Sequence, residues 1–248
     1  MLPALLLAAA FAILWRVMRG GRRSRRPWIP DKKQRRRAQY GGWVRRAVAG
    51  FLLPSIVGLA LLGRLAALVT LPPEFAGLAA LIGPLQLSDA LLFGAGLAGG
   101  VLGALAGTWW AWRRGKRGVR GPMLGDVGAL LPRHRGELPL AAALAITAGV
   151  VEEPFFRLLL PLLITMVTGS AGVGFALAAL LFGAAHRYQG WAGMAATTVM
   201  ALLFTTLYLA SGRLWVAIAF HAIIDLMGLV VRPALTGAWR RPSPDASS

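Results

Sequence analysis

Long apolar runs constrain this chain more than any other feature, because about 20 consecutive apolar residues span a lipid bilayer as a helix. About seven runs of roughly this length follow one another with short polar connections between them. They are Leu2–Met18, Val48–Leu71, Ala90–Trp112, Leu138–Thr168, Ala171–His186, Trp191–Ala210 and Leu214–Val231. The sequence therefore predicts an all-α fold, a polytopic membrane bundle of about seven transmembrane helices.

The composition excludes several other classes of protein. Hydrophobic residues make up 57% of the 248 residues and charged residues only 15%, whereas a soluble domain carries about 25% charged residues. A water-soluble enzyme is therefore not expected. Cysteine is absent, which excludes disulfides, cysteine-ligated metals and a thiol nucleophile.

Basic residues are concentrated in two connections, which predicts an orientation. Arg19–Arg46 contains 12 Lys and Arg residues and Arg113–Glu137 contains seven, whereas Pro72–Asp89 contains none. Positively charged connections face the cytoplasm. We therefore expect the N-terminus outside and the C-terminus in the cytoplasm. No basic segment precedes Leu2–Met18 and no clean cleavage site follows it, so this run is expected to be a retained anchor.

The basic segment Gly21–Arg46 has two readings, a nucleic-acid arm or a juxtamembrane segment that attracts anionic lipid head groups. Its aromatic residues form no stacking platform and suit membrane-interface anchors instead. We expect lipid contact and no nucleic-acid partner. Within Ala90–Trp112, glycines recur every four residues at Gly99, Gly103 and Gly107, which favours close packing against a neighbouring helix.

Charged and ionisable residues inside the last four apolar runs are the most informative signal, since each costs roughly 2.5–3.5 kcal/mol on insertion scales. They are Glu152, Glu153, Arg157, His186, His221 and Asp225. Glu153 and Arg157 are four residues apart, as are His221 and Asp225, so each pair shares one face of a helix. Pro154 removes a helical hydrogen bond and predicts a kink beside the two glutamates, at a buried polar pocket.

Each of these residues also has a structural explanation. Glu153 and Arg157 can form an ion pair that holds helices together, and we favour that role for both. His221 and Asp225 can satisfy each other, and a histidine at a helix end such as His186 is often an interface residue. Their joint occurrence in one C-terminal block favours a shared polar site.

The ordered motifs Glu152-Glu153-x-x-x-Arg157, Phe182-x-x-x-His186 and His221-x-x-x-Asp225 resemble those of the CAAX-protease and bacteriocin-processing family of intramembrane proteases. The resemblance covers roughly residues 138–231. It implies hydrolysis of a peptide bond in a membrane-associated substrate by activated water, with Glu152, His186, His221 and Asp225 as catalytic residues. Glu153 and Arg157 would then hold the kinked helix in place.

Two positions depart from the family pattern. Leu158 stands where the family commonly has Gly, and Asp225 stands where it commonly has Asn. An ionised Asp offers no hydrogen-bond donor, so Asp225 would be protonated, orient His221 or bind a metal. Zinc held by Glu152, His186, His221 and Asp225 is the alternative arrangement, and the sequence leaves metal-dependent and glutamate-type chemistry open.

Two other functions stay open on the sequence. The intramembrane acids and bases could form the ion pathway of a transporter, although the first half of the chain has no matching motif. A non-catalytic scaffold or bacteriocin-immunity protein is the second alternative.

The division of the chain follows from these expectations. Residues 1–46 form an anchor helix and a basic cytoplasmic segment, and residues 47–137 form accessory helices with a basic loop. Residues 138–232 form the protease-like core, and residues 233–248 form a disordered tail. The composition suggests a bacterial inner-membrane protein.

Overall fold

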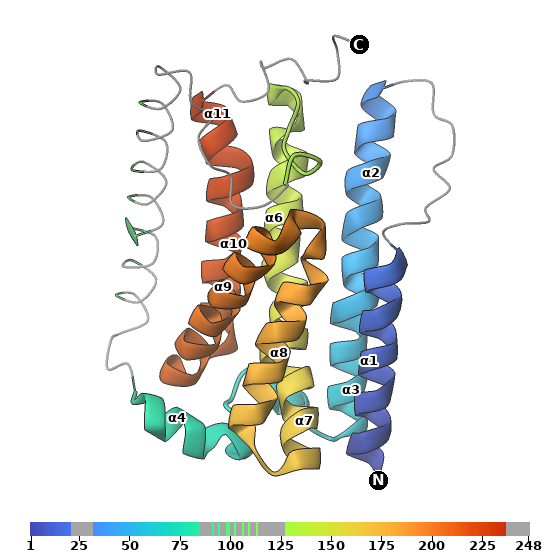
Figure 1. Ribbon diagram of the computed structural model, residues 1–248, viewed down its shortest axis with the longest axis vertical. Helices are drawn as coiled ribbons and strands as arrows, with labels where there is room; N and C mark the ends of the chain where they lie inside the picture. The colour runs from blue at the N-terminus through green and yellow to red at the C-terminus, as the bar shows by residue number, and fades with distance from the viewer. Residues whose placement is uncertain are drawn as a thin grey trace.

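The computed structural model describes residues 1–20, 32–84 and 127–236, together with single positions 91, 94, 98, 99, 102, 106, 109 and 113. These residues form helices and short connections, with no strand among them (Figure 1). The all-helical prediction is confirmed. Most of the predicted run Ala90–Trp112, including Gly103 and Gly107, and the tail 237–248 lie outside the described residues.

The N-terminal half supplies two long helices that lie side by side. Helix α1 covers Leu2–Gly20. Helix α2, Lys32–Ala47, continues through a π-helical turn, η1 (Val48–Leu52), into α3 (Leu53–Leu61). The predicted helix Val48–Leu71 is therefore wrong at both ends, because the helical stretch begins at Lys32 and ends at Leu61. The basic residues before it are good helix formers, and Gly63, with a φ of 66°, turns the chain soon after α3 ends.

Three short elements follow α3 and fill the connection to the undescribed segment. They are the 3₁₀ turns η2 (Leu65–Leu68) and η3 (Pro73–Phe75) and the helix α4 (Ala76–Ile82). The ring of Phe75 lies 4.7 Å from that of Phe175, centroid to centroid, so this connection packs on the C-terminal half.

The longest helical stretch of the C-terminal half runs from Leu138 to Thr168 in three parts. A 3₁₀ turn, η4 (Arg135–Glu137), leads into α6 (Leu138–Glu153). The π-helix η5 (Pro154–Leu159) follows and passes into α7 (Leu160–Thr168). Proline at the first position of η5 cannot donate the regular helical hydrogen bond, and the widened π turn accommodates that loss.

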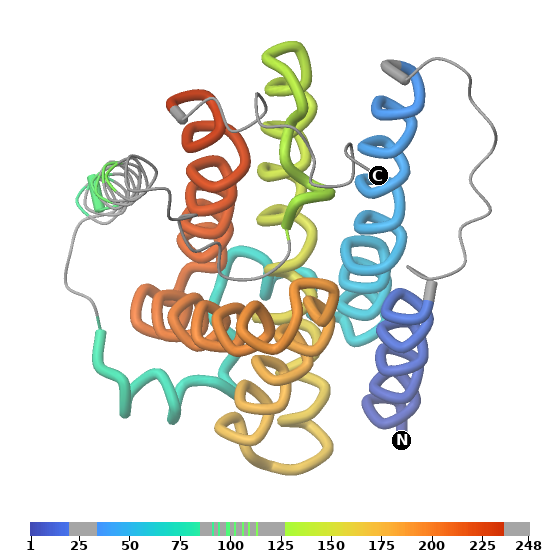
Figure 2. The backbone as a smooth tube through the Cα atoms, turned by 45° about the horizontal axis from the view of Figure 1, so that its top comes forward, coloured from blue at the N-terminus to red at the C-terminus, as the bar shows by residue number. Residues whose placement is uncertain are grey.

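The next two helices meet at a corner inside the bundle. Helix α8 (Ala171–Ala185) begins after Ser170, whose hydroxyl accepts a hydrogen bond from the Val173 N–H, and ends halfway along the molecule. A 3₁₀ turn, η6 (Arg187–Gln189), then leads into α9 (Gly190–Ser211), which crosses the bundle obliquely (Figure 2). The predicted run Ala171–His186 is therefore a half-length helix that brings its C-terminal end to mid-height.

The chain finishes with a helix that returns along α6. Helix α10 (Leu214–Leu226) continues through the π-helix η7 (Met227–Val231) into α11 (Arg232–Thr236). Figure 1 places α11 and the first residues of α2 and α6 at one end of the molecule and the N-terminus at the other.

Four helical stretches among the described residues are long and apolar enough to cross a membrane. They are Leu2–Arg19, Gln34–Leu61, Arg187–Ser211 and Leu214–Leu235. These helices indicate that the chain is a membrane protein. The number of about seven spans and the orientation of the chain stay predictions.

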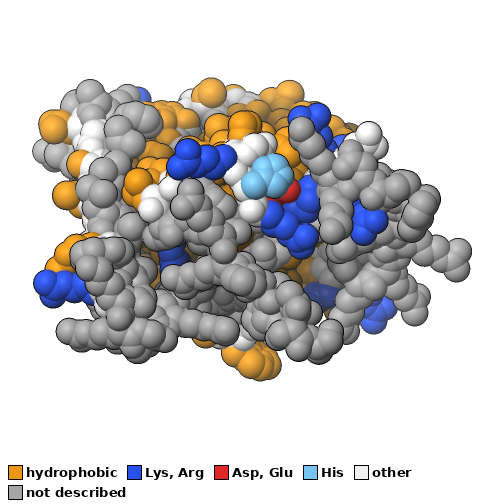
Figure 3. Space-filling model, turned by 90° about the horizontal axis from the view of Figure 1, so that it is seen from above, with side chains coloured by type: hydrophobic (Ala, Val, Ile, Leu, Met, Phe, Trp, Pro, Cys, Tyr) orange, Lys and Arg blue, Asp and Glu red, His pale blue; other side chains and the backbone are white. Residues whose placement is uncertain are grey.

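A buried ion pair holds α2 to the segment before α6. The guanidinium of Arg36 lies 3.1 Å from Glu137 and donates a hydrogen bond to the carbonyl of Leu131, and Tyr40 donates to a neighbouring carbonyl. Burial raises the pKa of Glu137, but hydrogen bonds from Arg36 and the backbone N–H of Arg133 outweigh it and leave the pKa lowered. This end of the molecule also carries exposed basic side chains (Figure 3).

Candidate active site

Small residues on one face of α6 bring it close to α10. Ala141, Ala145 and Gly149 recur every four residues and are buried. A Cβ atom on Gly149 would lie only 2.8 Å from the backbone oxygen of Ile218, so the two backbones touch there. The next position on this face is Glu153, which therefore reaches the side chains of α10.

Glu153 and Asp225 flank the two ring nitrogens of His221. Glu153 Oε1 lies 2.7 Å from His221 Nδ1, and Asp225 Oδ2 lies 3.7 Å from His221 Nε2. A carboxylate only accepts hydrogen bonds, so Nδ1 carries the proton that is donated to Glu153. The distance to Asp225 is too long for a hydrogen bond, which leaves Nε2 without a close partner among the described residues.

Arg157 lies directly behind Glu153 and is 0% exposed. Its Nε is 3.1 Å from Glu153 Oε2, and its guanidinium carbon lies 4.8 Å from the ring centroid of Phe182 and 5.5 Å from that of Phe204. The pair lacks hydrogen-bond geometry, and none of the three guanidinium nitrogens has a hydrogen-bond partner among the described residues. Arg157 is therefore held by the charge of Glu153 and by cation–π contacts with the rings of Phe182 and Phe204.

The same two phenylalanines fix the plane of His221. The ring of Phe204 stacks on the imidazole at 5.1 Å with an interplanar angle of 16°, and Phe182 meets its edge at 5.9 Å and 81°. Because the rotation of the imidazole is blocked on both sides, its two nitrogens keep their directions toward Glu153 and Asp225.

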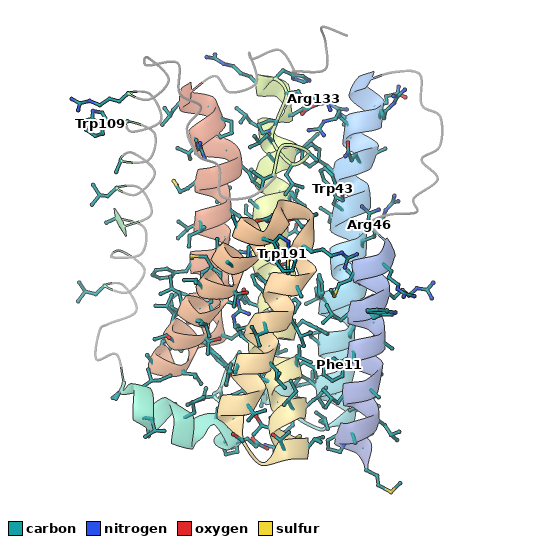
Figure 4. All side chains as sticks on the ribbon, in the orientation of Figure 1. Phe11, Trp43, Arg46, Trp109, Arg133 and Trp191 are labelled. Atoms are coloured by element: carbon teal, nitrogen blue, oxygen red, sulfur yellow. The ribbon has the colours of Figure 1, made fainter. Side chains whose placement is uncertain are left out.

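His186 reaches the site from the end of α8. Its Nδ1 lies 2.8 Å from the backbone oxygen of Phe182, and since a carbonyl only accepts, Nδ1 is the donor and Nε2 keeps a lone pair. Helix α8 lies close to α9, because a Cβ on Gly183 would meet the Met194 carbonyl at 2.9 Å. In Figure 4, Trp191 marks this corner at mid-height.

Glu152 is half-buried beside this cluster. Its Oε2 is buried without a hydrogen-bond partner among the described residues. The carboxyl interacts electrostatically with His221 and with Arg157, and Asp225 interacts likewise with His186. The structure therefore brings all six sequence-predicted residues into one neighbourhood, with Glu153 rather than Glu152 bound to His221.

The described residues contain no group of three His, Asp or Glu side chains arranged to hold a metal. Nδ1 of His221 is engaged by Glu153, and Nδ1 of His186 by Phe182, so Nε2 is the open nitrogen of each histidine.

Three features of the site were not predicted from the sequence. The contact of Glu153 with His221 joins residues 68 positions apart and has no local signal. The aromatic support from Phe204 looks like any core residue in the sequence. The close approach of α6 and α10 does have a signal, because Ala141, Ala145 and Gly149 form a small-residue repeat.

The comparisons with known proteins agree with this picture. The model of the family described as type II CAAX prenyl endopeptidase Rce1-like matches residues 134–227, which include all six residues of the site. Comparisons with curated proteins and with solved structures gave no match. The predicted family resemblance is confirmed and supports protease activity. The C-terminal part of the chain, residues 134–227, is therefore similar to the Rce1-like CAAX protease family.

Proposed function

We propose that the chain is an intramembrane endopeptidase that hydrolyses a peptide bond of a membrane-associated protein or peptide with activated water. One observation carries the proposal. The hydrogen bond of 2.7 Å between Glu153 and His221 holds α10 against α6 beside Glu152, whose buried Oε2 has no partner among the described residues.

Glu152 acts as the general base. Its unpartnered oxygen accepts a proton from a water molecule, and Nε2 of His186 accepts the second O–H of the same water and orients it. The water oxygen then bonds to the peptide carbonyl carbon, and the carbonyl electron pair moves onto its oxygen. When this oxyanion collapses, the C–N bond breaks and the amine takes the proton from Glu152.

His221 stabilises the oxyanion in this scheme. In the imidazolium form, Nδ1 donates to Glu153 and Nε2 is free to donate to the oxyanion, with the carboxylates of Glu153 and Asp225 beside the two nitrogens. Asp225 thus acts on His221 by its charge, and Arg157 balances Glu153 behind it. The mechanism is of the glutamate type.

The test compares cells that express the wild-type chain with cells that express Glu152→Gln. This change keeps the size of the side chain and removes the base, so membrane-protein fragments seen with the wild type should disappear. Quantitative mass spectrometry of protein termini in the membrane fraction measures this and identifies the substrate.

A matched control and a purified assay sharpen the comparison. Glu74→Gln alters a glutamate that pairs with Arg64 at 2.6 Å, away from the site, and should leave every fragment in place. The purified full chain in nanodiscs should cleave internally quenched peptides that carry an apolar anchor and a randomised segment. Equal cleavage by the wild type and Glu152→Gln, or no cleavage by the wild type, contradicts the proposal.

The proposed orientation places the N-terminus outside and residues 113–137 in the cytoplasm of a bacterial cell, where the exposed basic side chains would face anionic lipid head groups. The chain has no native cysteine, so single cysteines report on this directly. In intact cells, a membrane-impermeant maleimide should label Gly77→Cys, at an exposed position with open space around it, and leave Gly118→Cys unlabelled. Labelling of Gly118→Cys in intact cells would reverse the orientation.

A further inference from the structure

Tyr188 lies at the edge of the site and has no part in the scheme above. It belongs to the turn η6, two residues after His186. Its ring centroid is 5.8 Å from that of His186, with an interplanar angle of 37°. The side chain is 52% exposed, so it packs on the catalytic histidine on one side and is open on the other.

The hydroxyl of Tyr188 has an unused proton. Gln189 Nε2 donates to the hydroxyl oxygen at 3.1 Å, and no acceptor for the Tyr188 O–H is present among the described residues. The hydroxyl also interacts electrostatically with the carboxyl groups of Glu152 and Asp225. A proton donor therefore lies beside His186, on the open side of the cluster.

The six site residues offer few hydrogen-bond donors to an oxyanion. An oxyanion is stabilised by preorganised hydrogen-bond donors aimed at it. Of the six site residues, Glu152, Glu153 and Asp225 accept as carboxylates, and Nδ1 of His186 and of His221 is already occupied. Arg157 is buried behind Glu153. Nε2 of His221 is left as one donor, whereas oxyanion sites commonly use more than one.

We propose that the Tyr188 hydroxyl is a catalytic hydrogen-bond donor, which binds the peptide carbonyl oxygen of the substrate and stabilises the oxyanion formed there. The inference rests on the proposed function. It assigns the second donor to the turn between α8 and α9, while His221 on α10 supplies the first. Gln189 supports this role, because its donation to the phenolic oxygen makes the O–H a better donor.

The test uses the purified full chain and the internally quenched peptides in nanodiscs. Tyr188→Phe keeps the ring on His186 and removes only the hydroxyl, so kcat should fall about 100–1,000-fold with KM changed little. The matched control is Tyr208→Phe, which removes a buried hydroxyl of α9 that has no hydrogen-bond partner among the described residues, and it should cleave like the wild type.

A second substitution separates donation from packing. Gln189→Leu keeps the tyrosine and removes the N–H that donates to its phenolic oxygen, so it should lower kcat by a smaller factor than Tyr188→Phe does. Melting temperatures of all variants close to that of the wild type would show that the fold is kept. Undiminished kcat in Tyr188→Phe overturns the assignment of Tyr188, while cleavage by the wild type upholds the proposed function. If the wild type does not cleave the peptides, both the assignment of Tyr188 and the proposed function are wrong.

Discussion

Glu153→Gln should lower the free energy of unfolding by about 3–5 kcal/mol, the usual cost of removing one partner of a buried ion pair. Arg157 is fully buried, and its nitrogens have no hydrogen-bond partner among the described residues. Loss of the Glu153 charge would leave the guanidinium unbalanced between the rings of Phe182 and Phe204. Unfolding in detergent with increasing denaturant measures the change.

The double variant Glu153→Gln/Arg157→Met should recover part of this stability, because a long apolar side chain replaces the unpaired cation. Glu152→Gln is the matched control, since it alters the neighbouring carboxyl and should unfold close to the wild type. If Glu153→Gln and the double variant unfold alike, the two side chains are not coupled as described.

Gly149→Leu should reduce peptide cleavage at least 100-fold and lower stability by about 1–3 kcal/mol, as overpacking of a filled contact does. A side chain at this position has no room, because its Cβ would lie 2.8 Å from the Ile218 oxygen and 3.0 Å from the Ala222 nitrogen. Helix α10 must then move away from α6, which lengthens the 2.7 Å contact between Glu153 and His221.

Gly149→Ala should show a smaller effect in the same direction, since it adds a Cβ and nothing beyond it. Gly228→Ala provides the control, because a Cβ there meets nothing within 4 Å, and alanine is the better helix former. Cleavage of the quenched peptides and thermal unfolding measure each variant. Wild-type behaviour of Gly149→Leu would show that the two helices are free to separate.

Much of the C-terminal half could be predicted from the sequence, because its apolar runs are bounded by strong signals. The run Leu138–Thr168 coincides with α6, η5 and α7. It ends at Gly169, whose φ of 75° suits glycine at a helix end. The six polar site residues also stood out, since charged groups are costly within apolar helices.

The N-terminal half was harder to predict for a physical reason. The predicted basic segment Gly21–Arg46 carries no signal for the helix α2, Lys32–Ala47, which leads without a break into η1 and α3. The fixed position of its Arg36 depends on Glu137, 101 residues further on. No local pattern encodes a partner at that distance.

Within the site, local spacing predicted one partner of His221 and missed the nearer one. The spacing of four residues favours Asp225, which lies 3.7 Å from Nε2. Glu153 approaches Nδ1 to 2.7 Å from another helix, and that contact depends on how closely α6 and α10 pack. The catalytic roles of the individual residues stay predictions until the variants are measured.

At the π-helix η5, the helical periodicity of the stretch from Leu138 to Thr168 shifts by one residue. A π turn bonds each N–H five residues back rather than four, so it stores one residue more than a regular helix would. If the same residues formed a regular α-helix at Pro154–Leu159, everything after them would turn by about 100° relative to the two glutamates. The buried face of α7 would then rotate away from α8. A single stored residue thus lets the charged and apolar halves of the helix each face its own neighbours.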